Sequence, residues 1–327
     1  MRAGRARAVS GKNEGQRPAR ALAPSLGSEP QLIGALIASL RPRQWTKNLL
    51  LFAGVLFSRQ LGEPGLALRA AAGFLAFSLL SGAVYLLNDV RDLEEDRRHP
   101  VRRLRPIASG RLPVPAAWAA LVPVLGAVVA LARWLGPGFT TVAATYLVVN
   151  LAYTFFLKKQ VLIDVFVIAS GFVMRAIAGV ELLLPVSPGT EISPWLLMCT
   201  FFGALFLALG KRGRELSNAG EDAHSKRAVL EHYTPELVDG LLLVAAAASV
   251  MSYALYTIWP GTVAKFGTEH LLWTVPFVAY GIFRYLYVVW GARSSEDPSQ
   301  VLLADRPLLA CVLLYLGAVV LILYLRA

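Results

Sequence analysis

The sequence is poor in charge for its length. Charged side chains make up 16% of its 327 residues, whereas hydrophobic ones make up 56%. An average soluble domain carries about 25% charged residues, so this composition excludes an ordinary water-soluble domain and favours an integral membrane protein. The net charge of +11 would suggest nucleic acid as a partner of a soluble protein. In a membrane protein such charge belongs to the loops beside the spans, so we expect no nucleic-acid partner.

Cysteine and histidine are scarce as well. The two cysteines, Cys199 and Cys311, lie in separate apolar runs with neither CxxC spacing nor a histidine partner. They offer no zinc site and no obvious disulfide, and packing is the simplest role for both. No pairing of histidine with a nucleophile is recognisable near the main cluster of charge.

The N-terminal segment lacks the apolar core and the cleavage site of a signal peptide. Arginine and lysine stand there among Ala, Gly, Ser and Pro, a composition that favours disorder. We expect residues 1–31 to form a disordered basic cytoplasmic tail, and residues 32–327 to form a single transmembrane catalytic domain.

Nine apolar stretches are long enough, or nearly so, to cross a hydrocarbon core about 30 Å thick. They run from 32 to 58, 66 to 89, 113 to 132, 138 to 157, 161 to 184, 194 to 210, 237 to 259, 270 to 291 and 306 to 325. Arg41, Arg43 and Lys47 interrupt the first stretch, so an interfacial helix leading into a short span is an alternative there. The sequence therefore predicts an all-α integral membrane protein with about nine transmembrane helices.

Basic residues mark one side of the predicted bundle. They gather in the tail and in the loops after the second, fourth, sixth and eighth stretches, whereas the loop at 185–193 has none. The positive-inside rule then places these loops and the N-terminus in the cytoplasm. We expect a multi-pass protein of the cell (inner) membrane.

A dense charged cluster ends the second stretch, in YLLNDVRDLEEDRRHPVRRLRP at 85–106. Asn88, Asp92 and Asp96 recur every four residues and share one face if the helix continues, and Asp89 stands three residues before Asp92. Carboxylates this close need a cation among them. The arginines that follow are one candidate, but Mg²⁺ bound through a substrate diphosphate suits the pattern better, because Mg²⁺ prefers one or two carboxylates plus phosphate oxygens and water. A solvated charged loop is the alternative.

This string, followed by His99-Pro100 and by RPIASG at 105–110, resembles the first aspartate-rich signature of the UbiA superfamily of intramembrane prenyltransferases. Three further segments resemble one branch of it, the decaprenyl-phosphate phosphoribosyltransferases: LRPRQWTKNLLLFAG at 40–54, YTFFLKKQVLIDVFVIASGFVMRAIAG at 153–179 and GKRGREL at 210–216. The resemblance runs from about residue 40 to the C-terminus. It implies a UbiA-type helical bundle with a cytoplasmic-side active site.

The resemblance also implies an activity. The enzyme would transfer 5-phosphoribose from phosphoribosyl pyrophosphate to a polyprenyl (decaprenyl-like) phosphate and release diphosphate, with Mg²⁺ as the cofactor. Asn88 and Asp92 would hold the metal with help from Asp89 and Asp96. The residues implied to bind the donor are Lys47, Tyr85, Arg102, Lys158 and Arg175. Arg102 departs from the lysine usual in this branch, which weakens its assignment because the two side chains differ in geometry.

The basic stretch after the sixth span supports the same branch. Aromatic prenyltransferases of the superfamily carry a second aspartate-rich loop there, whereas this chain has Lys211, Arg212 and Arg214. A cationic loop suits an anionic lipid phosphate better than a neutral phenol. We expect Lys211 and Arg212 to bind the acceptor phosphate. In a cell that makes arabinan, the product would be a precursor of that cell-wall polymer.

Two charges lie inside the fifth span. Asp164 and Arg175 are eleven residues apart and fall on almost the same helix face. Because a charge in a span costs at least about 2.5 kcal/mol, each is a functional candidate. The alternative is a structural Asp–Arg pair that ties helices together.

Two rival functions stay open at this point. A UbiA-type aromatic prenyltransferase that uses a polyprenyl diphosphate would share the fold and the first motif. A non-enzymatic transporter would more commonly show paired half-sequences with broken helices. A homo-oligomer stays open as an alternative to a monomer.

The asymmetry of basic residues predicts the topology. In a Cys199→Ser, Cys311→Ser background, a single cysteine introduced as Lys159→Cys should react with a membrane-impermeant thiol reagent only from the cytoplasmic side. Pro188→Cys should react only from the opposite side, because its loop lacks basic residues. Labelling of both positions from the same side would contradict the predicted order of spans.

Overall fold

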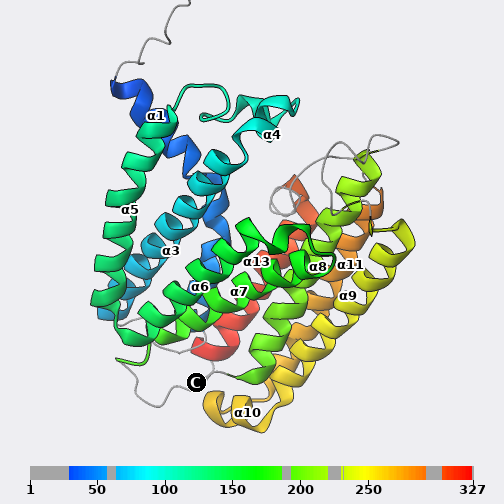
Figure 1. The fold of residues 1–327 in the computed structure, drawn as a ribbon. Helices are drawn as coiled ribbons and strands as arrows, with labels where there is room; N and C mark the ends of the chain where they lie inside the picture. The colour runs from blue at the N-terminus through cyan, green and yellow to red at the C-terminus, as the bar shows by residue number, and fades with distance from the viewer. Residues whose placement is uncertain are drawn as a thin grey trace, which may run out of the picture.

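The computed structural model describes residues 29–56, 64–185, 193–219, 230, 232–291 and 304–325. All regular elements in these ranges are helices, as Figure 1 shows. Most of the predicted tail at 1–31 lies outside the described residues.

Eight long helices form the bundle: α3 (Pro64–Arg91), α5 (Val114–Leu135), α6 (Pro137–Phe155), α7 (Ile163–Glu181), α8 (Pro194–Ala219), α9 (Pro235–Ile258), α11 (Val275–Gly291) and α13 (Arg306–Val320). Shorter elements join them: α1 (Glu29–Ser39), η1 (Pro42–Leu50), α2 (Leu51–Leu56), α4 (Leu93–Arg98), η2 (Arg102–Leu104), η3 (Leu157–Lys159), α10 (Pro260–Phe266), η6 (His270–Thr274) and η7 (Leu321–Leu325). Within the described residues, eight helical segments are long and apolar enough to cross a membrane.

The first predicted span is not one continuous helix. α1 ends before Arg41, which has a left-handed backbone (φ 54°), and η1 begins at Pro42. Proline disfavours the α conformation of the residue before it, which accounts for the break. The remaining eight predicted spans correspond to the eight long segments, so the difference from nine lies entirely at this N-terminal stretch.

Helix α8 is longer than predicted. The expected span ended at residue 210, but α8 continues to Ala219. Lys211, Arg212 and Arg214 therefore lie on a helix and not on a loop. A prediction from hydropathy ends the span at the first charged residues. In the structure Arg212 and Arg214 are buried against other helices, and the helix continues through them.

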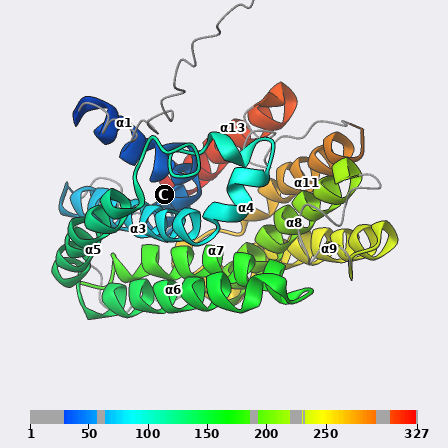
Figure 2. The same cartoon turned by 45° about the horizontal axis from the view of Figure 1, so that its top comes forward.

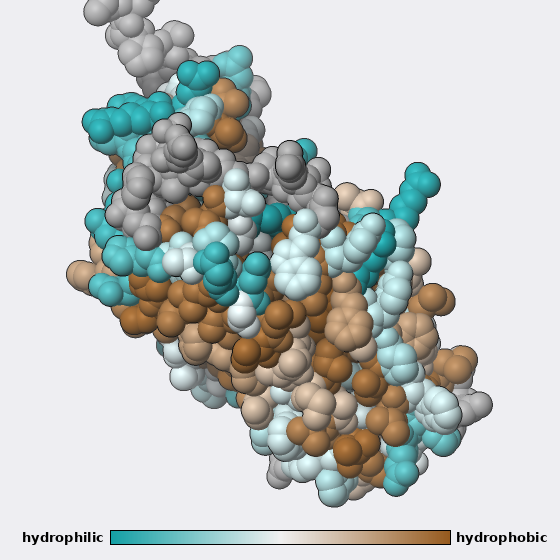
Figure 3. All heavy atoms as spheres, turned by 90° about the vertical axis from the view of Figure 1, so that its right-hand side faces the viewer, coloured by the Kyte–Doolittle hydropathy of each residue, from teal (hydrophilic) through white to brown (hydrophobic). Residues whose placement is uncertain are grey.

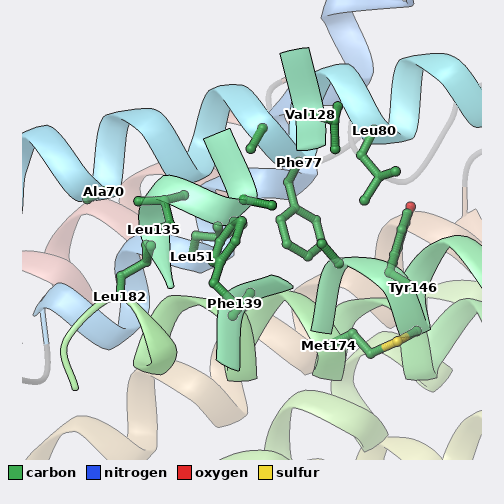
Figure 4. Close-up of a cluster of buried hydrophobic side chains, with 14 of the residues drawn as sticks. Leu51, Ala70, Phe77, Leu80, Val128, Leu135, Phe139, Tyr146, Met174 and Leu182 are labelled. Atoms are coloured by element: carbon green, nitrogen blue, oxygen red, sulfur yellow. The ribbon is translucent and has the colours of Figure 1, made fainter. Parts of the chain in front are cut away.

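The helices form two packed groups. Figures 1 and 2 show α3, α5, α6 and α7 on one side of the bundle and α8, α9 and α11 on the other. Figure 4 shows the apolar cluster of the first group, in which Leu51, Phe77, Phe139 and Leu182 converge from separate elements. The second cluster joins α7, α8, α9, α11 and α13. Extensive contact between α7 and α8 connects the two groups.

One end of the bundle collects the charged elements. α3 ends there, α4 and η2 follow it in the chain, and η3 contacts it through Lys158. Figure 1 shows α4 near the top of the view. We call this end of the bundle the motif end. On the face drawn in Figure 3, apolar side chains cover most of the middle and hydrophilic ones gather mainly toward the upper end. Large apolar side chains such as Trp118 and Val122 on α5 and Trp273 on η6 are exposed, as expected for contact with lipid.

Helices α2 and α7 touch through glycine. A side-chain carbon on Gly179 would overlap the carbonyl oxygen of Leu51, and one on Gly54 would lie 2.8 Å from the backbone of Gly179. This contact seats α2, and η1 before it, against α7. Small residues allow such close helix packing in membranes. A larger side chain at either position would collide with the facing backbone and force it to move.

Gly179→Ala should therefore destabilise the protein by about 1–3 kcal/mol, the usual cost of overpacking. The measurement is the melting temperature of the purified protein in detergent. Gly126→Ala in α5 is the matched control, since its new side chain would meet nothing within 4 Å, and its melting temperature should be unchanged or slightly raised. Equal melting temperatures for the two variants would rule out the proposed contact.

Candidate active site where helix α3 ends

The acidic motif spans the junction of α3 and α4. α3 ends at Arg91 and α4 begins at Leu93, with Asp92 between them. Asp92 N donates to Asn88 O and Asp96 N donates to Asp92 O, both at 2.8 Å. The predicted helical spacing is therefore present across the junction, yet the side chains of the motif have two different kinds of partner.

Asp89 and Asp96 are bound by arginines. Their side chains are 2% and 0% exposed, and a single nitrogen of Arg105, Nη1, lies 3.1 Å from Asp89 Oδ1 and 2.7 Å from Asp96 Oδ2. Arg41 forms a second ion pair with Asp89, and Arg102 lies 3.5 Å from Asp96 Oδ1. Flanking arginines, the less favoured of the two cations considered from the sequence, thus neutralise this half of the motif.

Asn88 and Asp92 form the more open half. Thr154 Oγ1 donates to Asn88 Oδ1 at 2.6 Å, and Lys158 Nζ donates to Asp92 Oδ1 at 2.7 Å. Asp92 and Lys158 are 24% and 20% exposed, so both reach water. The structure brings together Asn88, Asp92 and Lys158 from the predicted set, and it adds Thr154.

The turn after α4 positions Arg102. His99 Nδ1 accepts hydrogen bonds from the backbone N–H groups of Val101 and Arg102, both at 3.2 Å. Arg102 Nη1 lies 3.1 Å from Glu95 Oε1, in addition to its contact with Asp96. Arg102 is therefore engaged with the motif itself, one quarter exposed at the motif end.

Arg175 lies in a buried network of neutral groups. Its Nε donates to Asn48 Oδ1 (2.7 Å), its Nη1 to Gly171 O (2.8 Å) and its Nη2 to Tyr146 Oη (2.8 Å). Asn48 Nδ2 donates in turn to Ser78 Oγ at 3.0 Å. Within the part of the chain that the structure describes, no carboxylate pairs with Arg175, so its positive charge is held in place without being cancelled.

Asp164 pairs with Arg212 of α8 and not with Arg175. Arg212 Nε lies 2.7 Å from Asp164 Oδ2, both side chains are at most 1% exposed, and Glu215 adds a second ion pair. Tyr233 Oη donates to Asp164 Oδ1 at 2.8 Å. Burial, together with this hydrogen bond to a carboxylate, raises the pKa of the Tyr233 phenol. The structural Asp–Arg pair considered as an alternative for Asp164 is therefore present, with a different arginine.

The remaining predicted residues lie around these groups. Tyr85 is half-buried on α3, and the guanidinium of Arg41 lies 4.6 Å from the centre of its ring. Lys47 is half-buried on η1, next to Asn48. Lys211 is half-buried on α8, next to Arg212. Arg212 itself is paired with Asp164 and Glu215.

Sequence reasoning missed several partners. Arg105 begins the RPIASG string, and Asn48 lies in the segment at 40–54. The signal for both was a polar side chain next to an apolar run. Thr154 and Tyr146 are single polar groups inside a span. Tyr233 carried no signal, because its role depends on a contact 69 residues away.

The chain matches the model of the UbiA prenyltransferase family over residues 32–305. It belongs to that family. It is also 34% identical over 307 residues to a decaprenyl-phosphate phosphoribosyltransferase of Mycolicibacterium smegmatis, covering 90% of this chain and 94% of the relative. A protein of the same name from Corynebacterium glutamicum is 34% identical over 301 residues, covering 90% of this chain and 88% of the relative. The family resemblance expected from the motifs is confirmed, and the chain is a multi-pass membrane protein.

Solved structures share the fold. A UbiA homolog from Archaeoglobus fulgidus, bound to GPP and Mg²⁺, has a TM-score of 0.66 at 18% identity and covers 88% of this chain and 99% of its own. The apo structure of a UbiA homolog from Aeropyrum pernix has a TM-score of 0.63 at 16% identity, with 89% and 98% covered. At these identities the likeness establishes the UbiA-type bundle alone.

The donor set at the open half of the motif fits a magnesium ion. Asn88 and Asp92 present one amide oxygen and one carboxylate, partly exposed at the edge of a span. Mg²⁺ commonly binds proteins through one or two carboxylates and completes its shell with phosphate oxygens and water. In the described ranges, no group of three or more His, Cys, Asp or Glu side chains is arranged to hold a metal by itself.

The two halves of the motif should respond differently to neutralisation. Asp96→Asn should lower the melting temperature, because it leaves the guanidinium of Arg105 without one of its two carboxylates. The loss should fall toward the lower end of the roughly 3–5 kcal/mol for breaking a buried ion pair, since Arg105 is 31% exposed. Asp92→Asn should change the melting temperature little, because Asp92 and Lys158 both reach water. A reversed order of stability in detergent would refute this division.

Proposed function

We propose that this protein is a phosphoribosyltransferase that moves 5-phosphoribose from phosphoribosyl pyrophosphate to the phosphate of a long polyprenyl phosphate and releases diphosphate. The observation that carries the proposal is the 34% identity, over 90% of the chain, to an enzyme named decaprenyl-phosphate phosphoribosyltransferase. The site agrees with it, because cations gather at the motif end beside the more open Asn88 and Asp92.

Asn88 and Asp92 are the proposed magnesium ligands. The ion, when bound, stabilises the negative charge that builds on the departing diphosphate. Lys158 lies beside Asp92, so its ammonium is available to a phosphate bound at this half of the motif. The other proposed donor contacts are Lys47, Tyr85, Arg102 and Arg175. Arg175 is the best suited of them to bind an anion, because no carboxylate among the described residues pairs with it.

Asp89 and Asp96 have a positioning role in this proposal. Their ion pairs with Arg41 and Arg105 fasten η1 and the segment after α4 to the end of α3. These contacts keep the two acidic groups away from the metal and hold the donor-binding elements together. This proposal gives them a structural role in place of the expected help in holding magnesium.

The reaction needs no proton transfer. An oxygen of the lipid phosphate, already an anion, forms the new bond to C1 of the ribose. The bond from C1 to the diphosphate oxygen breaks, and its electron pair leaves with the diphosphate. Positive charge develops on the ribose ring between these events, as in glycosyl transfer generally. The protein therefore has to orient two anions and balance charge, which agrees with the absence of a predicted general base.

The acceptor phosphate is proposed to bind at the end of α8. Lys211 is half-buried there. Arg212 is held by Asp164 and Glu215, so it supports Lys211 by fixing this turn of α8 against α7. The positive-inside rule places the motif end in the cytoplasm and the N-terminus inside the cell. The basic residues on α8 also disfavour an aromatic prenyltransferase, which has acidic residues at this place.

The direct test is an incubation of membranes that contain the protein with labelled phosphoribosyl pyrophosphate, Mg²⁺ and polyprenyl phosphate. Label should move into the lipid extract only when both substrates and the metal are present. Label transfer from a prenyl diphosphate to a phenolic acceptor, with none from phosphoribosyl pyrophosphate, would establish the aromatic prenyltransferase instead.

Asp92→Asn should abolish this transfer while the protein still folds and inserts. The substitution removes the carboxylate proposed for magnesium at a partly exposed position and leaves the spans intact. Glu94→Gln is the matched control two residues away, because Glu94 is 76% exposed and pairs with Arg97. Its activity should equal that of the wild type. Normal activity of Asp92→Asn at ordinary Mg²⁺ concentrations would remove Asp92 from the metal site.

A further inference from the structure

Arg214 is a buried cation without a counter-charge. It lies on α8 near its C-terminal end, and the residue is 7% exposed. Its Nη2 donates to Tyr285 Oη at 3.3 Å, and its Nε has no hydrogen-bond partner. In the described part of the chain no carboxylate lies within ion-pair distance of this guanidinium.

The neighbouring Arg212 shows that the fold can neutralise an arginine at this depth. Arg212 is as deeply buried, and it pairs with both Asp164 and Glu215. Two positions further along α8, Arg214 faces α11 instead, and among the described residues its guanidinium bonds to the hydroxyl of Tyr285 alone. A buried, unpaired charge costs several kcal/mol, so a group that keeps one is a functional candidate.

The surroundings of Arg214 have a polar and an apolar part. A side-chain carbon on Gly210, one turn earlier in α8, would lie 3.2 Å from both the ring and the hydroxyl of Tyr285. Glycine at this position thus lets the phenol lie close to α8, where it meets Arg214. Leu209 and Leu286 are buried in the apolar cluster next to this pair. Figures 1 and 2 both show α8 beside α11.

We propose that Arg214 and the hydroxyl of Tyr285 bind the phosphate of the acceptor lipid. This rests on the function proposed above and adds two residues to the acceptor site. Arg214 lies in the last turn of the membrane-spanning part of α8, the depth at which a phosphate rests when its prenyl tail stays in hydrocarbon. A guanidinium offers two N–H groups to a phosphate, and a phenol adds a third donor.

The charge balance of the motif end favours the acceptor lipid over the phosphoribosyl donor as the ligand of Arg214. The cations paired with the acidic motif lie before η1, after α4 and after α6. The donor is proposed to bind among these segments. Arg214 instead faces α11 within the second packed group, among apolar side chains. A lipid head suits this setting, because one side of the site stays apolar and the other supplies uncancelled positive charge.

The test measures melting temperatures of the purified protein in detergent with polyprenyl phosphate, with the uncharged polyprenol, or with phosphoribosyl pyrophosphate. In the wild type, polyprenyl phosphate should stabilise the protein more than polyprenol does. Arg214→Met should remove that difference, weakening lipid-phosphate binding by about tenfold or more. Tyr285→Phe should reduce it. Stabilisation by phosphoribosyl pyrophosphate should persist in both variants.

Arg212→Met is the matched control for a purely structural arginine. It should lower the melting temperature without lipid, because it leaves Asp164 buried and unpaired, whereas Arg214→Met should leave that temperature unchanged or raise it. A lower lipid-free melting temperature for Arg214→Met, with the phosphate-specific difference intact, would overturn the assignment. The assignment would also be overturned if Arg214→Met lost only the stabilisation by phosphoribosyl pyrophosphate and kept that by polyprenyl phosphate. If the wild type bound polyprenyl phosphate through Arg214 yet transferred no phosphoribose, the proposed function would fail and this site would stand.

Discussion

Charge that is buried at the end of an apolar bundle has to be balanced, and this requirement organises the whole motif end. Arg105 satisfies it for two carboxylates at once, since one of its nitrogens lies within 3.1 Å of both Asp89 and Asp96. Arg41 adds its charge from the break before η1. These ion pairs fasten two chain segments, η1 and the segment after α4, to the end of α3. They also hold the surroundings of Asn88 and Asp92 in place.

The same requirement separates structural from substrate-binding cations. Arg105 and Arg212 are cancelled by carboxylates of the protein, so they hold helices together. Arg175 and Arg214 are buried, like Arg212, but meet neutral groups among the described residues. An enzyme that joins two anionic substrates needs positive charge of this second kind, held in position before the substrates arrive. The distribution of counter-charges thus links the packing of the helices to the proposed reaction.

Local patterns in the sequence predicted a large part of this organisation. Hydropathy located the eight long segments, and the four-residue spacing of Asn88, Asp92 and Asp96 predicted a helical motif that the backbone confirms. Hydropathy does not register the break at Arg41, which is a local effect of Pro42. The continuation of α8 past residue 210 was also beyond hydropathy, because Arg212 is buried there against Asp164, 48 residues away in the chain. Spacing alone also could not assign Asp96 to Arg105 and Asp92 to Lys158, since that division arises from tertiary contacts.

The most direct test of the account is a structure determined with phosphoribosyl pyrophosphate and Mn²⁺ in place of Mg²⁺, in which anomalous scattering locates the metal. The division of the motif predicts metal beside Asn88 and Asp92, with Arg105 still bound to both Asp89 and Asp96. Metal bound to Asp89 or Asp96, with Arg105 displaced, would contradict it.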